Sequence, residues 1–267
     1  MIVLKIGGAQ GVSIDAICRD IAALAEEGES LVVVHGGSAE TNAISTKLGS
    51  PPRFVTSVSG YTSRYTDRST LEIFAMVTNG KINTMLVEKL QGYGVNAIGL
   101  SGVDGRLMVA RRKDAIRILE NGRQRILRDD YTGKIEQVNA PLLSALLDLK
   151  MTPVIAPLAI SPLGEALNVD ADRAAAMIAG ALHATQLVIL TNVPGLLRHY
   201  PDESSLISNL PHAGLERALS FAEGRMKKKV LGASEALDMG VSKVIFSDGR
   251  IDNPLHLAIS GKGTVIS

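Results

Sequence analysis

Two apolar segments near the start of the chain each end in a pair of glycines and lead into a helical pattern. The first segment and its glycines span residues 2–8, and the second span residues 31–37. The helical patterns that follow them cover about residues 13–27 and 38–48. Strands with no polar face that alternate with helices are typical of a parallel sheet covered by helices. We therefore expect an α/β fold with a mainly parallel sheet.

The same alternation continues to the end of the chain. Further helices are predicted over residues 67–91, 138–149, 170–183 and 224–239, and further strands over residues 95–100, 153–156, 187–190, 244–246 and 264–266. Residues 106–128 read as short β segments, and Asn121-Gly122 is the strongest hairpin-turn signal in the chain. We expect one domain over residues 1–267, in which residues 1–165 and 166–267 form two lobes of a single sheet.

The charge of the chain is balanced overall but uneven along its length. The 267 residues carry 28 basic and 27 acidic side chains, and a net charge of +1 argues against a dedicated nucleic-acid-binding protein. Residues 106–128 nevertheless hold eight basic and two acidic side chains, a local net charge of +6 that leaves −5 for the rest. Such a run is usually a solvated hairpin, but an acidic partner would also favour it.

The only cysteine, Cys18, lies in an apolar helical pattern and reads as a small core residue. A single cysteine excludes an internal disulfide and fits a reducing compartment. The sequence shows neither a signal-peptide pattern nor an apolar run of about 18 residues. We therefore expect a cytoplasmic protein without a membrane segment.

The two glycine pairs indicate a site for an anion. Lys5 stands just before Gly7-Gly8, and Gly36-Gly37 opens a helix. Glycine lets backbone N–H groups approach a phosphate, and helix N-termini favour anions. The carboxyl ends of parallel strands share one edge of a sheet, where ligands bind. Each pair alone would also suit an ordinary turn, so the inference depends on the two pairs together.

Several better-known site patterns are missing from the sequence. It contains no P-loop, no G-x-G-x-x-G fingerprint and no G-x-S-x-G segment that would supply a hydrolase nucleophile. It contains no H-E-x-x-H pattern, and its five histidines are too scattered for a zinc site. An anionic substrate or phosphoryl group held by backbone amides is the interpretation that the glycine pairs favour.

Two further polar segments follow later strands. Asn168 and Asp172 flank Asp170, which suits the N-cap of the helix that follows. Capping alone would explain Asp170 but not the second acid or the amide. Residues 191–195, Thr-Asn-Val-Pro-Gly, form a loop after an apolar strand.

A basic segment opens the helix predicted over residues 224–239. It reads Gly-Arg-Met-Lys-Lys-Lys over residues 224–229. On a helical wheel Lys229 is placed to reach a phosphate, whereas Lys227 and Lys228 point elsewhere. A solvated basic helix face is the simpler interpretation of the run.

In this order, these segments resemble the amino acid kinase family, whose members include acetylglutamate kinase, aspartokinase, carbamate kinase and uridylate kinase. The resemblance covers essentially the whole chain and is closest to the acetylglutamate kinase branch. Residues 36–42 depart from the Gly-Gly-Gly-Pro form usual in acetylglutamate kinases and are similar to a sub-branch that acts on an amino-group carrier protein in lysine biosynthesis. The same sub-branch is matched by residues 51–54, 63–68, 96–102 and 130–133.

The resemblance implies the amino acid kinase fold, a three-layer αβα sandwich, and a role for each matching residue. Lys5 and Lys229 would stabilise the transferring phosphoryl group, and Asp172 would orient them. The implied substrate-binding residues are Gly36, Gly37, Arg64 and Asn168. The implied ATP-binding residues are Gly7, Gly8, Thr191, Asn192, Val193, Gly195, Gly224 and Met226. ATP with Mg²⁺ is the implied donor, no metal-ligating side chain is implied, and the N-terminal lobe would bind the acceptor while the C-terminal lobe binds ATP.

The implied reaction is ATP-dependent phosphorylation of the side-chain carboxylate of L-2-aminoadipate, whose amine is masked by the C-terminal Glu of a small acidic carrier protein. The basic stretch would then steer that carrier toward the site. Carrier-linked glutamate, a substrate for arginine biosynthesis, stays open because one methylene discriminates by only about 1–3 kcal/mol. The alternative function is an acetylglutamate kinase of arginine biosynthesis, which acts on free acetylglutamate. A catalytically inactive nucleotide or amino-acid sensor with the same fold would be expected to lack Lys5, Asp172 or Lys229, and all three are present.

The resemblance also bears on assembly. We expect a homodimer formed through the helix at residues 67–91. Because the first strand begins at Ile2, we expect neither the N-terminal helix of hexameric acetylglutamate kinases nor their arginine inhibition. An acyl phosphate reacts with water, so some closure over the site is expected.

Overall fold

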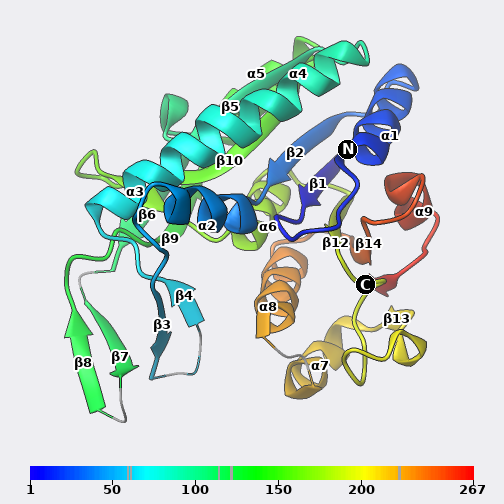
Figure 1. Ribbon diagram of the computed structural model, residues 1–267. Coiled ribbons are helices and arrows are strands. Elements are labelled where there is room, and N and C mark those ends of the chain that lie inside the picture. The colour runs from blue at the N-terminus through cyan, green and yellow to red at the C-terminus, as the bar shows by residue number, and fades with distance from the viewer. Residues whose placement is uncertain (59, 61, 114, 121–122, 222–223) are drawn as a thin grey trace.

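Eleven strands form the central sheet of the computed structural model, which describes all residues except 59, 61, 114, 121–122 and 222–223 (Figure 1). The main path of the sheet runs β13-β15-β14-β12-β1-β2-β10-β6-β9, and β5 and β11 also pair with β10. The strands are β1 (Ile2–Ile6), β2 (Leu31–His35), β5 (Ala97–Gly102), β6 (Met108–Arg112), β9 (Gly133–Val138), β10 (Thr152–Ile160), β11 (Ala166–Asn168), β12 (Gln186–Thr191), β13 (Asn209–Leu210), β14 (Lys243–Asp248) and β15 (Thr264–Ile266).

The centre of the sheet is parallel, and helices cover both of its faces (Figure 1). One face carries α1 (Ile14–Glu26), α4 (Thr84–Gly92) and α9 (Pro254–Ile259). The other carries α5 (Ala140–Asp148), α6 (Ala171–Ala181), α7 (Leu215–Phe221) and α8 (Gly224–Asp238). Antiparallel pairs occur where β9, β11 and β15 join the sheet. The predicted α/β sandwich with a mainly parallel sheet is confirmed.

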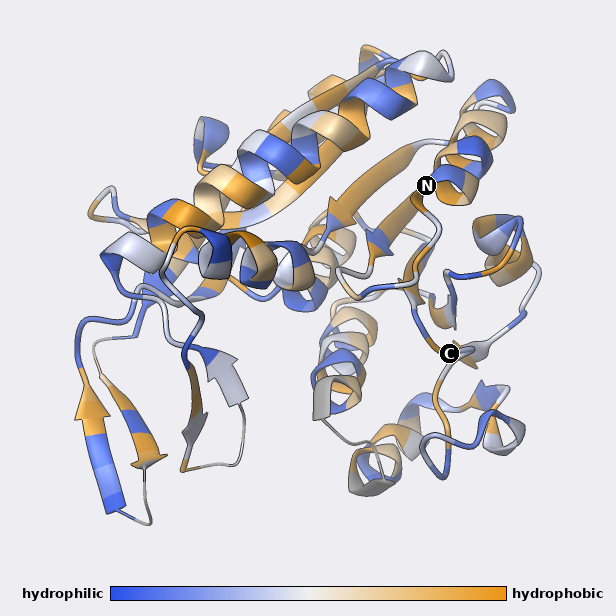
Figure 2. Cartoon of the chain, viewed as in Figure 1, coloured by the Kyte–Doolittle hydropathy of each residue, from blue (hydrophilic) through white to orange (hydrophobic). Residues whose placement is uncertain are grey.

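The alternation of side chains along β1 decides which helical layer each one faces. Ile2, Leu4 and Ile6 lie in the core beneath α1, α4 and α9, whereas Val3 lies in the core on the other face. Successive side chains of a strand point to opposite faces, so Lys5 points toward α6 and α8. Figure 2 shows the neighbouring strands as hydrophobic along most of their length, which makes Lys5 an exception within a buried strand.

A second sheet of four antiparallel strands projects at the lower left of Figure 1. Its order is β4-β3-β7-β8, with bounds β3 (Phe54–Ser57), β4 (Thr62–Arg64), β7 (Ile116–Glu120) and β8 (Arg123–Leu127). The β7–β8 hairpin was predicted, but its expected turn at Asn121-Gly122 lies outside the described residues. The sequence did not reveal β3 and β4, because short, partly exposed strands have little apolar periodicity. β3 joins the basic hairpin to β4, whose last residue is Arg64.

The long helix predicted over residues 67–91 is helical but not uniform. It consists of α3 (Arg68–Ala75), the π-helix η1 (Met76–Asn83) and α4. Thr78 Oγ1 donates to the carbonyl of Phe74 at 2.8 Å, a side-chain bond of the kind that loosens a helix. A π-turn holds more residues than an α-turn and so redirects the side chains that follow. Asn83, at the end of η1, is buried.

The remaining differences concern element boundaries and short elements. The helix expected from residue 138 begins at Ala140, because residues up to Val138 belong to β9 and Asn139 caps the helix through the Leu142 N–H. The α7 and α9 helices and the strands β9, β11 and β13 were not predicted. The 3₁₀ turns are η2 (Asp104–Arg106), η3 (Glu203–Ser205) and η4 (His212–Gly214), and α2 (Ser38–Lys47) follows β2 as expected.

Cys18 is a free cysteine buried in the core under α1, as predicted. Within the described part of the chain, no helix combines the length and apolar character that a bilayer crossing requires.

Candidate active site

Lys5 and Lys229 meet at the carboxylate of Asp172. Lys5 Nζ lies 2.6 Å from Asp172 Oδ1, and Lys229 Nζ lies 2.9 Å from both carboxylate oxygens. The side chains are only 5%, 12% and 11% exposed, in the order Lys5, Lys229, Asp172. The structure thus brings together the three residues expected to be catalytic and leaves one net positive charge in a mostly buried cluster.

Neighbouring side chains fix the two helices that supply this cluster. Asp170 caps α6 and accepts the N–H of Asp172 at 3.0 Å, which sets Asp172 in the first turn. Arg173, the next residue, forms an ion pair with Glu235 on α8, with Nε 2.9 Å from Oε2. This pair fastens α6 to α8, so Asp172 and Lys229 are held at a fixed separation.

Burial and charge act in opposite directions on the ionisable groups of the cluster. Burial alone would raise the pKa of Asp172, but the charges of Lys229 and Lys5 hold that pKa well below its ordinary value. Burial lowers the pKa of Lys229 to about 8, and the charge of Lys5 adds to this effect while Asp172 opposes it. Asp172 is therefore a permanent anion, whereas Lys229 titrates closer to neutrality than an exposed lysine does.

The two glycine loops lie against each other at the ends of β1 and β2. A Cβ on Gly8 would lie 2.6 Å from the nitrogen of Gly37, and a Cβ on Gly36 would lie 3.0 Å from the nitrogen of Gly8. A Cβ on Gly7 would lie 2.8 Å from a carbonyl oxygen of β12. Only glycine permits this close approach of backbone to backbone.

The four glycine amides divide into two pairs. Gly7 and Gly36 donate their N–H groups to backbone carbonyls of β12 and β1, at 2.9 and 3.0 Å, and so extend the sheet. Across the residues that the structure describes, the N–H groups of Gly8 and Gly37 have no acceptor within hydrogen-bonding distance. Gly37 also stands at the N-cap of α2, where a helix favours negative charge. Gly8 and Gly37 are thus the amides that can bind an anion.

Arg64 and Asn168 approach the site from β4 and β11. Arg64 is buried, and its Nη2 donates to Asn42 Oδ1 at 2.6 Å and to the carbonyl of Ser38 at 3.3 Å, both on α2. The Asn168 amide donates to the hydroxyl of Thr66 at 3.0 Å, and that hydroxyl donates to the carbonyl of Arg64 at 3.1 Å. One hydroxyl therefore connects the two residues expected to bind substrate.

The buried carboxylate of Asp130 completes this connection, and sequence reasoning did not assign it a role. Its two oxygens accept the N–H groups of Thr66 and Thr132, at 3.1 and 2.8 Å. Asp130 thereby holds the segment after β4 against the segment before β9. Asp130 and Thr66 lie in segments 130–133 and 63–68, which resemble the family, but the sequence does not show that these two segments are in contact.

Lys228 is a further residue that the sequence did not identify as part of the site. It points away from the direction of Lys229, as the helical wheel predicts, but its Nζ donates to the carbonyl of Thr62 at 2.9 Å. This contact joins α8 to β4, across 166 positions of sequence. Gly224 begins α8, and Met226 packs in part against the core beneath α5, α6 and α8.

The Thr-Asn-Val-Pro-Gly loop leaves β12 beside the end of β1. Thr191 Oγ1 accepts the N–H of Val193 at 3.0 Å, which tightens the turn, and Asn192 is exposed. A Cβ on Gly195 would lie 2.6 Å from Thr264 Oγ1, so the loop passes close to β15. The loop opens at the same edge of the sheet as the glycine pairs.

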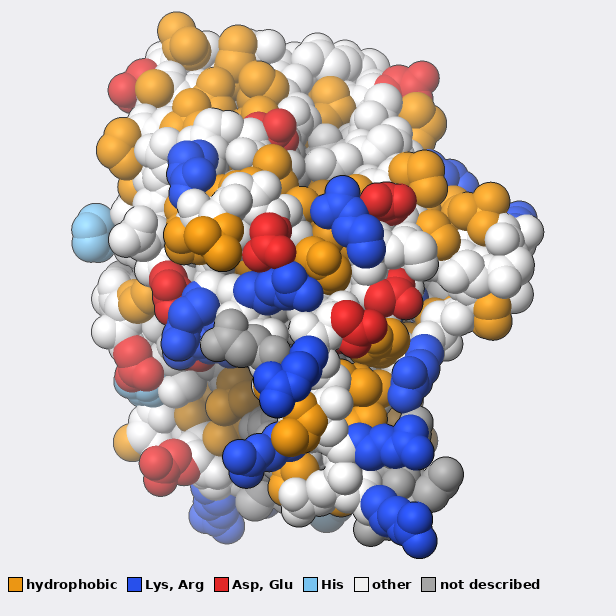
Figure 3. Space-filling model, turned by 90° about the vertical axis from the view of Figure 1, so that its left-hand side faces the viewer, with side chains coloured by type: hydrophobic (Ala, Val, Ile, Leu, Met, Phe, Trp, Pro, Cys, Tyr) orange, Lys and Arg blue, Asp and Glu red, His pale blue; other side chains and the backbone are white. Residues whose placement is uncertain are grey.

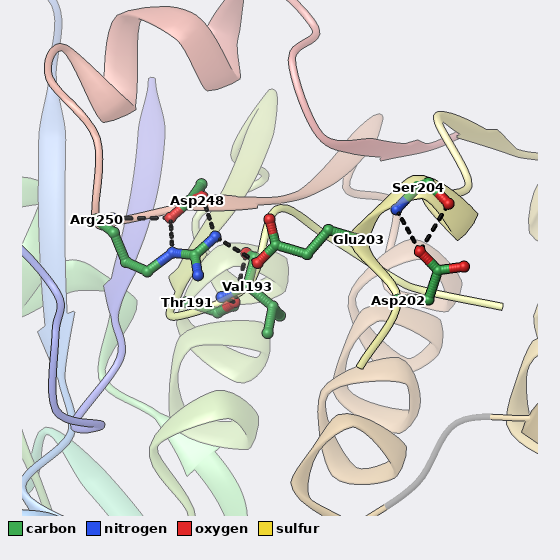
Figure 4. Close-up of polar contacts among 7 residues, drawn as sticks. All are labelled: Thr191, Val193, Asp202, Glu203, Ser204, Asp248 and Arg250. Carbon is green, nitrogen blue, oxygen red and sulfur yellow. Dashed lines mark hydrogen bonds and ion pairs between the residues drawn. The ribbon is translucent and has the colours of Figure 1, made fainter. Parts of the chain in front are cut away.

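Figure 4 shows an ion-pair network next to this loop. Arg250 Nη2 lies 2.6 Å from Asp248 Oδ2 and 2.8 Å from Glu203 Oε1. Asp248 ends β14, opposite Thr191 in the register of β12. The network therefore fixes the segment around η3 beside the Thr-Asn-Val-Pro-Gly loop, a connection that the sequence alone did not reveal.

The basic stretch lines an open groove formed by β6 and β9 of the central sheet and by β7 and β8 of the second sheet. This groove has a volume of about 600 Å³, and we call it the basic groove. It is lined by Arg111, Arg112, Lys113, Ala115, Arg117, Ile126, Arg128 and Lys134. In Figure 3 Lys and Arg side chains gather in the lower half of this side of the molecule, where Figure 1 places the second sheet. Arg111 and Arg112 also form ion pairs with Glu136 and Glu165, both at 2.8 Å, so part of the charge is neutralised.

The side chains present determine which kind of metal the site could accept. In the described ranges of the chain, no group of three or more His, Cys, Asp or Glu side chains is arranged to hold a metal. Asp172 is already committed to two lysines. Mg²⁺ commonly keeps waters and binds substrate phosphates with few protein ligands. The site therefore fits a Mg²⁺ that arrives with a nucleotide better than a resident metal.

Comparison with known proteins agrees with the geometry. Residues 1–248 match the amino acid kinase family. The chain is 55% identical over its full length to LysW-aminoadipate kinase of Deinococcus radiodurans, of which it covers 91%, and 52% identical to LysW-aminoadipate kinase of Thermus thermophilus, with both chains fully covered. It is 37% identical to LysW-aminoadipate/LysW-glutamate kinase of Sulfolobus acidocaldarius, again over both full lengths.

Among solved structures, the chain is similar to N-acetylglutamate synthase from Neisseria gonorrhoeae complexed with coenzyme A and N-acetyl-glutamate. The TM-score is 0.81 at 25% identity, and the match covers all of this chain but 59% of the synthase. The chain thus spans little more than half the length of that enzyme. Carbamate kinase from Giardia lamblia bound to AMP-PNP gives a TM-score of 0.68 at 17% identity, with 99% of this chain and 97% of the kinase covered, and shares the fold.

Proposed function

Because the chain belongs to the amino acid kinase family, we propose that it uses ATP to phosphorylate the side-chain carboxylate of L-2-aminoadipate held on a small acidic carrier protein. The product, an acyl phosphate, would serve lysine biosynthesis. The observation that carries the proposal is the Lys5–Asp172–Lys229 cluster, because it provides buried positive charge at the sheet edge where two free glycine amides lie. The names and full-length identities of the relatives supply the substrate.

The reaction requires charge neutralisation more than proton transfer. An oxygen of the acceptor carboxylate attacks the γ-phosphorus, the bond to the β–γ bridging oxygen breaks, and ADP leaves. Acceptor and triphosphate are both anions and repel each other, so Lys5 and Lys229 offset that repulsion and stabilise the charge on the transferring group. Asp172 holds both ammonium groups in place without itself reacting.

The acceptor would lie between the glycine loops and β4. The N–H groups of Gly37 and Gly8 would bind oxygens of the reacting carboxylate and the phosphoryl group, while Gly36 permits the close packing of the loops. Arg64 would bind the α-carboxylate, because a guanidinium can hold a carboxylate with two parallel bonds. Asn168 would bind the substrate from β11, on the other side of Thr66.

ATP would bind toward the C-terminal lobe. We assign its phosphates to the N–H of Gly8 and to Lys229, with Gly7 allowing the loop to pass close to β12. We assign its nucleoside to the Thr-Asn-Val-Pro-Gly loop, including Asn192, and to the start of α8 at Gly224 and Met226. Mg²⁺ bound to the phosphates would neutralise part of their charge. In this arrangement residues 1–165 supply the acceptor site and residues 166–267 the nucleotide site, and the cluster at Asp172 lies between them.

The basic groove would receive the carrier protein. Its lining comes from β6 and β9 of the central sheet and from β7 and β8 of the second sheet. On the second-sheet side, β7 pairs with β3 and β3 with β4, so a partner in the groove is connected through these strands to Arg64. An acidic carrier would complement its charge and associate faster at low salt. A free amino acid derivative would gain little from such a surface.

One assay tests the proposed function. The purified enzyme would be incubated with ATP, Mg²⁺ and hydroxylamine, and acyl hydroxamate formation would be compared for carrier-linked aminoadipate, carrier-linked glutamate and free acetylglutamate. The highest kcat/KM is expected for carrier-linked aminoadipate. A preference for free acetylglutamate would refute the assignment and favour a role in arginine biosynthesis alone.

Carrier-linked glutamate is a second candidate substrate. The observation that favours it is the full-length similarity to an archaeal relative whose name includes both substrates. One methylene in an acceptor pocket is worth about 1–3 kcal/mol, so one enzyme can accept both. The assay above separates a strict from a dual enzyme by the ratio of the two kcat/KM values.

Assembly and location complete the proposal. A homodimer would form through the rod of α3, η1 and α4, on which Met76 and Met85 are exposed apolar side chains. Light scattering that gives a monomer or a hexamer would exclude it. A cytoplasmic location stays a prediction that rests on the single, buried cysteine.

A further inference from the structure

We propose that His35 and Asn83 are positioning residues that aim the N–H of Gly37 at the acceptor. This inference rests on the proposed function and deepens it, because it explains how one of the two free amides is held in its productive direction. Neither residue belongs to the lysine–aspartate cluster, and both are buried polar side chains that the mechanism above does not use.

His35 orients the peptide that joins Gly36 to Gly37. His35 Nδ1 lies 3.1 Å from the carbonyl oxygen of Gly36. A carbonyl can only accept, so Nδ1 carries the hydrogen and donates it. The carbonyl of Gly36 and the N–H of Gly37 belong to one planar trans peptide and therefore point in opposite directions. By fixing the carbonyl, His35 fixes the direction of the Gly37 N–H.

The Gly37 N–H points toward the face of the sheet that carries the lysine–aspartate cluster, as the alternation of side chains along β2 indicates. Along β2, Val33 lies in the core beneath α1, α4 and α9, and Val34 lies in the core on the other face. Since side chains alternate along a strand, His35 lies on the side of Val33. Lys5 points to the opposite face, toward α6 and α8. The Gly36 carbonyl thus points toward His35, and the Gly37 N–H points toward the side on which Lys5 meets Asp172.

Asn83 determines which tautomer His35 adopts. Asn83 Nδ2 donates to the carbonyl of Val154 at 2.9 Å and lies 3.1 Å from His35 Nε2. An amide nitrogen has two hydrogens and no acceptor capacity, so His35 Nε2 must accept. Asn83 therefore selects the tautomer with hydrogen on Nδ1. Burial also lowers the pKa of His35 to about 4, which keeps the ring neutral near pH 7.

The π-helix η1 and the space left by Gly99 place Asn83 beside His35. Asn83 ends the π-helix η1, and π-turns often occur at functional sites. A Cβ on Gly99 would lie 2.1 Å from Asn83 Oδ1, so the amide occupies space that only glycine leaves open. The same helix packs on the loop directly, because a Cβ on Gly37 would lie 2.7 Å from Ile82 Cδ1. η1 thus contacts both the glycine and the residue that orients it.

A matched pair of variants separates positioning from simple packing. The amide of Asn reaches the place of the histidine Nδ1, and the amide of Gln reaches the place of Nε2. His35→Asn keeps a donor to the Gly36 carbonyl, whereas His35→Gln keeps only the contact with Asn83. We expect His35→Asn to stay within about 3-fold of the parent kcat and His35→Gln to lose about 10-fold or more, since misplaced donors forfeit transition-state stabilisation. The KM for ATP should not change in either. Equal losses in kcat would overturn the proposal.

Gly99→Ala tests the same device without changing His35. Its new Cβ would displace the Asn83 amide, and we expect a loss in kcat of about 10-fold with an unchanged KM for ATP. Gly92→Ala is the control, because no atom lies within 4 Å of its Cβ position. Full activity of Gly99→Ala would contradict the proposal. A parent enzyme that phosphorylates no acceptor would remove the proposed function and this inference with it.

A measurement on the unmodified chain avoids any variant that fails to fold. Nitrogen NMR of protein labelled at histidine, assigned with His35→Gln, reports which ring nitrogen carries hydrogen. We expect hydrogen on Nδ1 of His35 at pH 7 in the absence of substrate. Hydrogen on Nε2 would overturn the proposal whatever the activity assays give.

Discussion

Asp172 and Lys229 lie on different helices, yet both oxygens of the Asp172 carboxylate accept hydrogen bonds from Lys229 Nζ, each at 2.9 Å. Lys5 adds a third contact to the same carboxylate from the central strand. The anion is thus the only described partner that the two ammonium groups share. Its removal should affect stability and catalysis together.

The first prediction concerns the neutral variant Asp172→Asn. Two mostly buried ammonium groups would lose their counter-charge and move apart, so we expect kcat to fall by about 100-fold or more. The loss of one partner from a buried ion pair should also reduce the free energy of unfolding by about 3–5 kcal/mol. Steady-state kinetics and urea unfolding measure the two effects.

Asp148→Asn is the matched control, because Asp148 is exposed at the end of α5. It should leave both kcat and the unfolding free energy within error of the parent. An Asp172→Asn enzyme with parental kcat would contradict the assigned role of the cluster.

The second prediction concerns pH. The pKa of Lys229 is lowered from 10.5 to about 8 in the folded chain, chiefly by burial. Above pH 8 the folded enzyme should lose this positive charge, so kcat/KM should fall on an alkaline limb near that pH. Between pH 8 and 10.5 the unfolded chain binds more protons than the folded one, so the contribution of Lys229 to stability should rise with pH.

Lys229→Arg tests the assignment of this limb. An arginine stays charged through this range, so the alkaline limb should move to higher pH even if the maximal rate is lower. Lys228→Arg should leave the limb where it is. A limb that stays near pH 8 in Lys229→Arg would show that another group titrates.

The third prediction concerns the contact between the glycine loops. In Gly8→Ala the new Cβ would lie 2.6 Å from the nitrogen of Gly37, so the loops must separate and both free amides must shift. We expect kcat to fall by about 10-fold or more, because such donors act only when correctly placed. Gly92→Ala again serves as the control and should retain full activity. Gly8→Ala with unchanged kcat would argue against amide binding of the transferring group.

Much of this centre follows from the sequence, and the reasons are specific. The strand β1, its glycines and the period-two alternation suffice to place Lys5 on one face of the sheet. The family resemblance supplied Asp172 and Lys229 as partners, and Asp170 was identified as the cap that it is. The contacts of His35 with Asn83 and of Lys228 with Thr62 were not predictable, because they join segments 48 and 166 positions apart through a π-turn and a sheet that the sequence did not reveal.

The fourth prediction concerns the basic groove. Lys113, Arg117 and Lys134 are exposed residues of its lining, and their replacement by Glu should raise the KM for a carrier-linked substrate by about 10-fold or more at low salt. Rising salt should raise the KM of the parent in the same direction. The kcat for a small free acceptor, where measurable, should not change.

Arg123→Glu is the control for the groove. It lies on the same hairpin but does not line the groove. A triple variant with the parental KM, or a parental rate that does not respond to salt, would exclude electrostatic recognition of the carrier. Arg112 is left intact in this design, because its ion pair with Glu165 and its position 3.8 Å over the Tyr131 ring give it a structural role.

The fifth prediction concerns Lys228. Its bond to the carbonyl of Thr62 connects the helix that carries Lys229 to the strand that ends in Arg64. Lys228→Met keeps the length of the side chain but removes the donor, so we expect a rise of about 3- to 10-fold in the KM for the acceptor and no change in the KM for ATP. Lys227→Met, an exposed neighbour on α8, is the control. Equal effects of both variants would show that only helix charge matters.

The fate of the γ-phosphoryl group in a single turnover tests the proposed kinase reaction directly. Enzyme in excess would be mixed with ATP labelled in the γ-phosphate and with carrier-linked aminoadipate, and the products would be separated by intact mass. We expect the label to appear on the carrier, to be lost on treatment with hydroxylamine, and to transfer far more slowly in Asp172→Asn. Label on the kinase itself, label on the carrier that resists hydroxylamine, or no transfer to the carrier would contradict the proposed reaction.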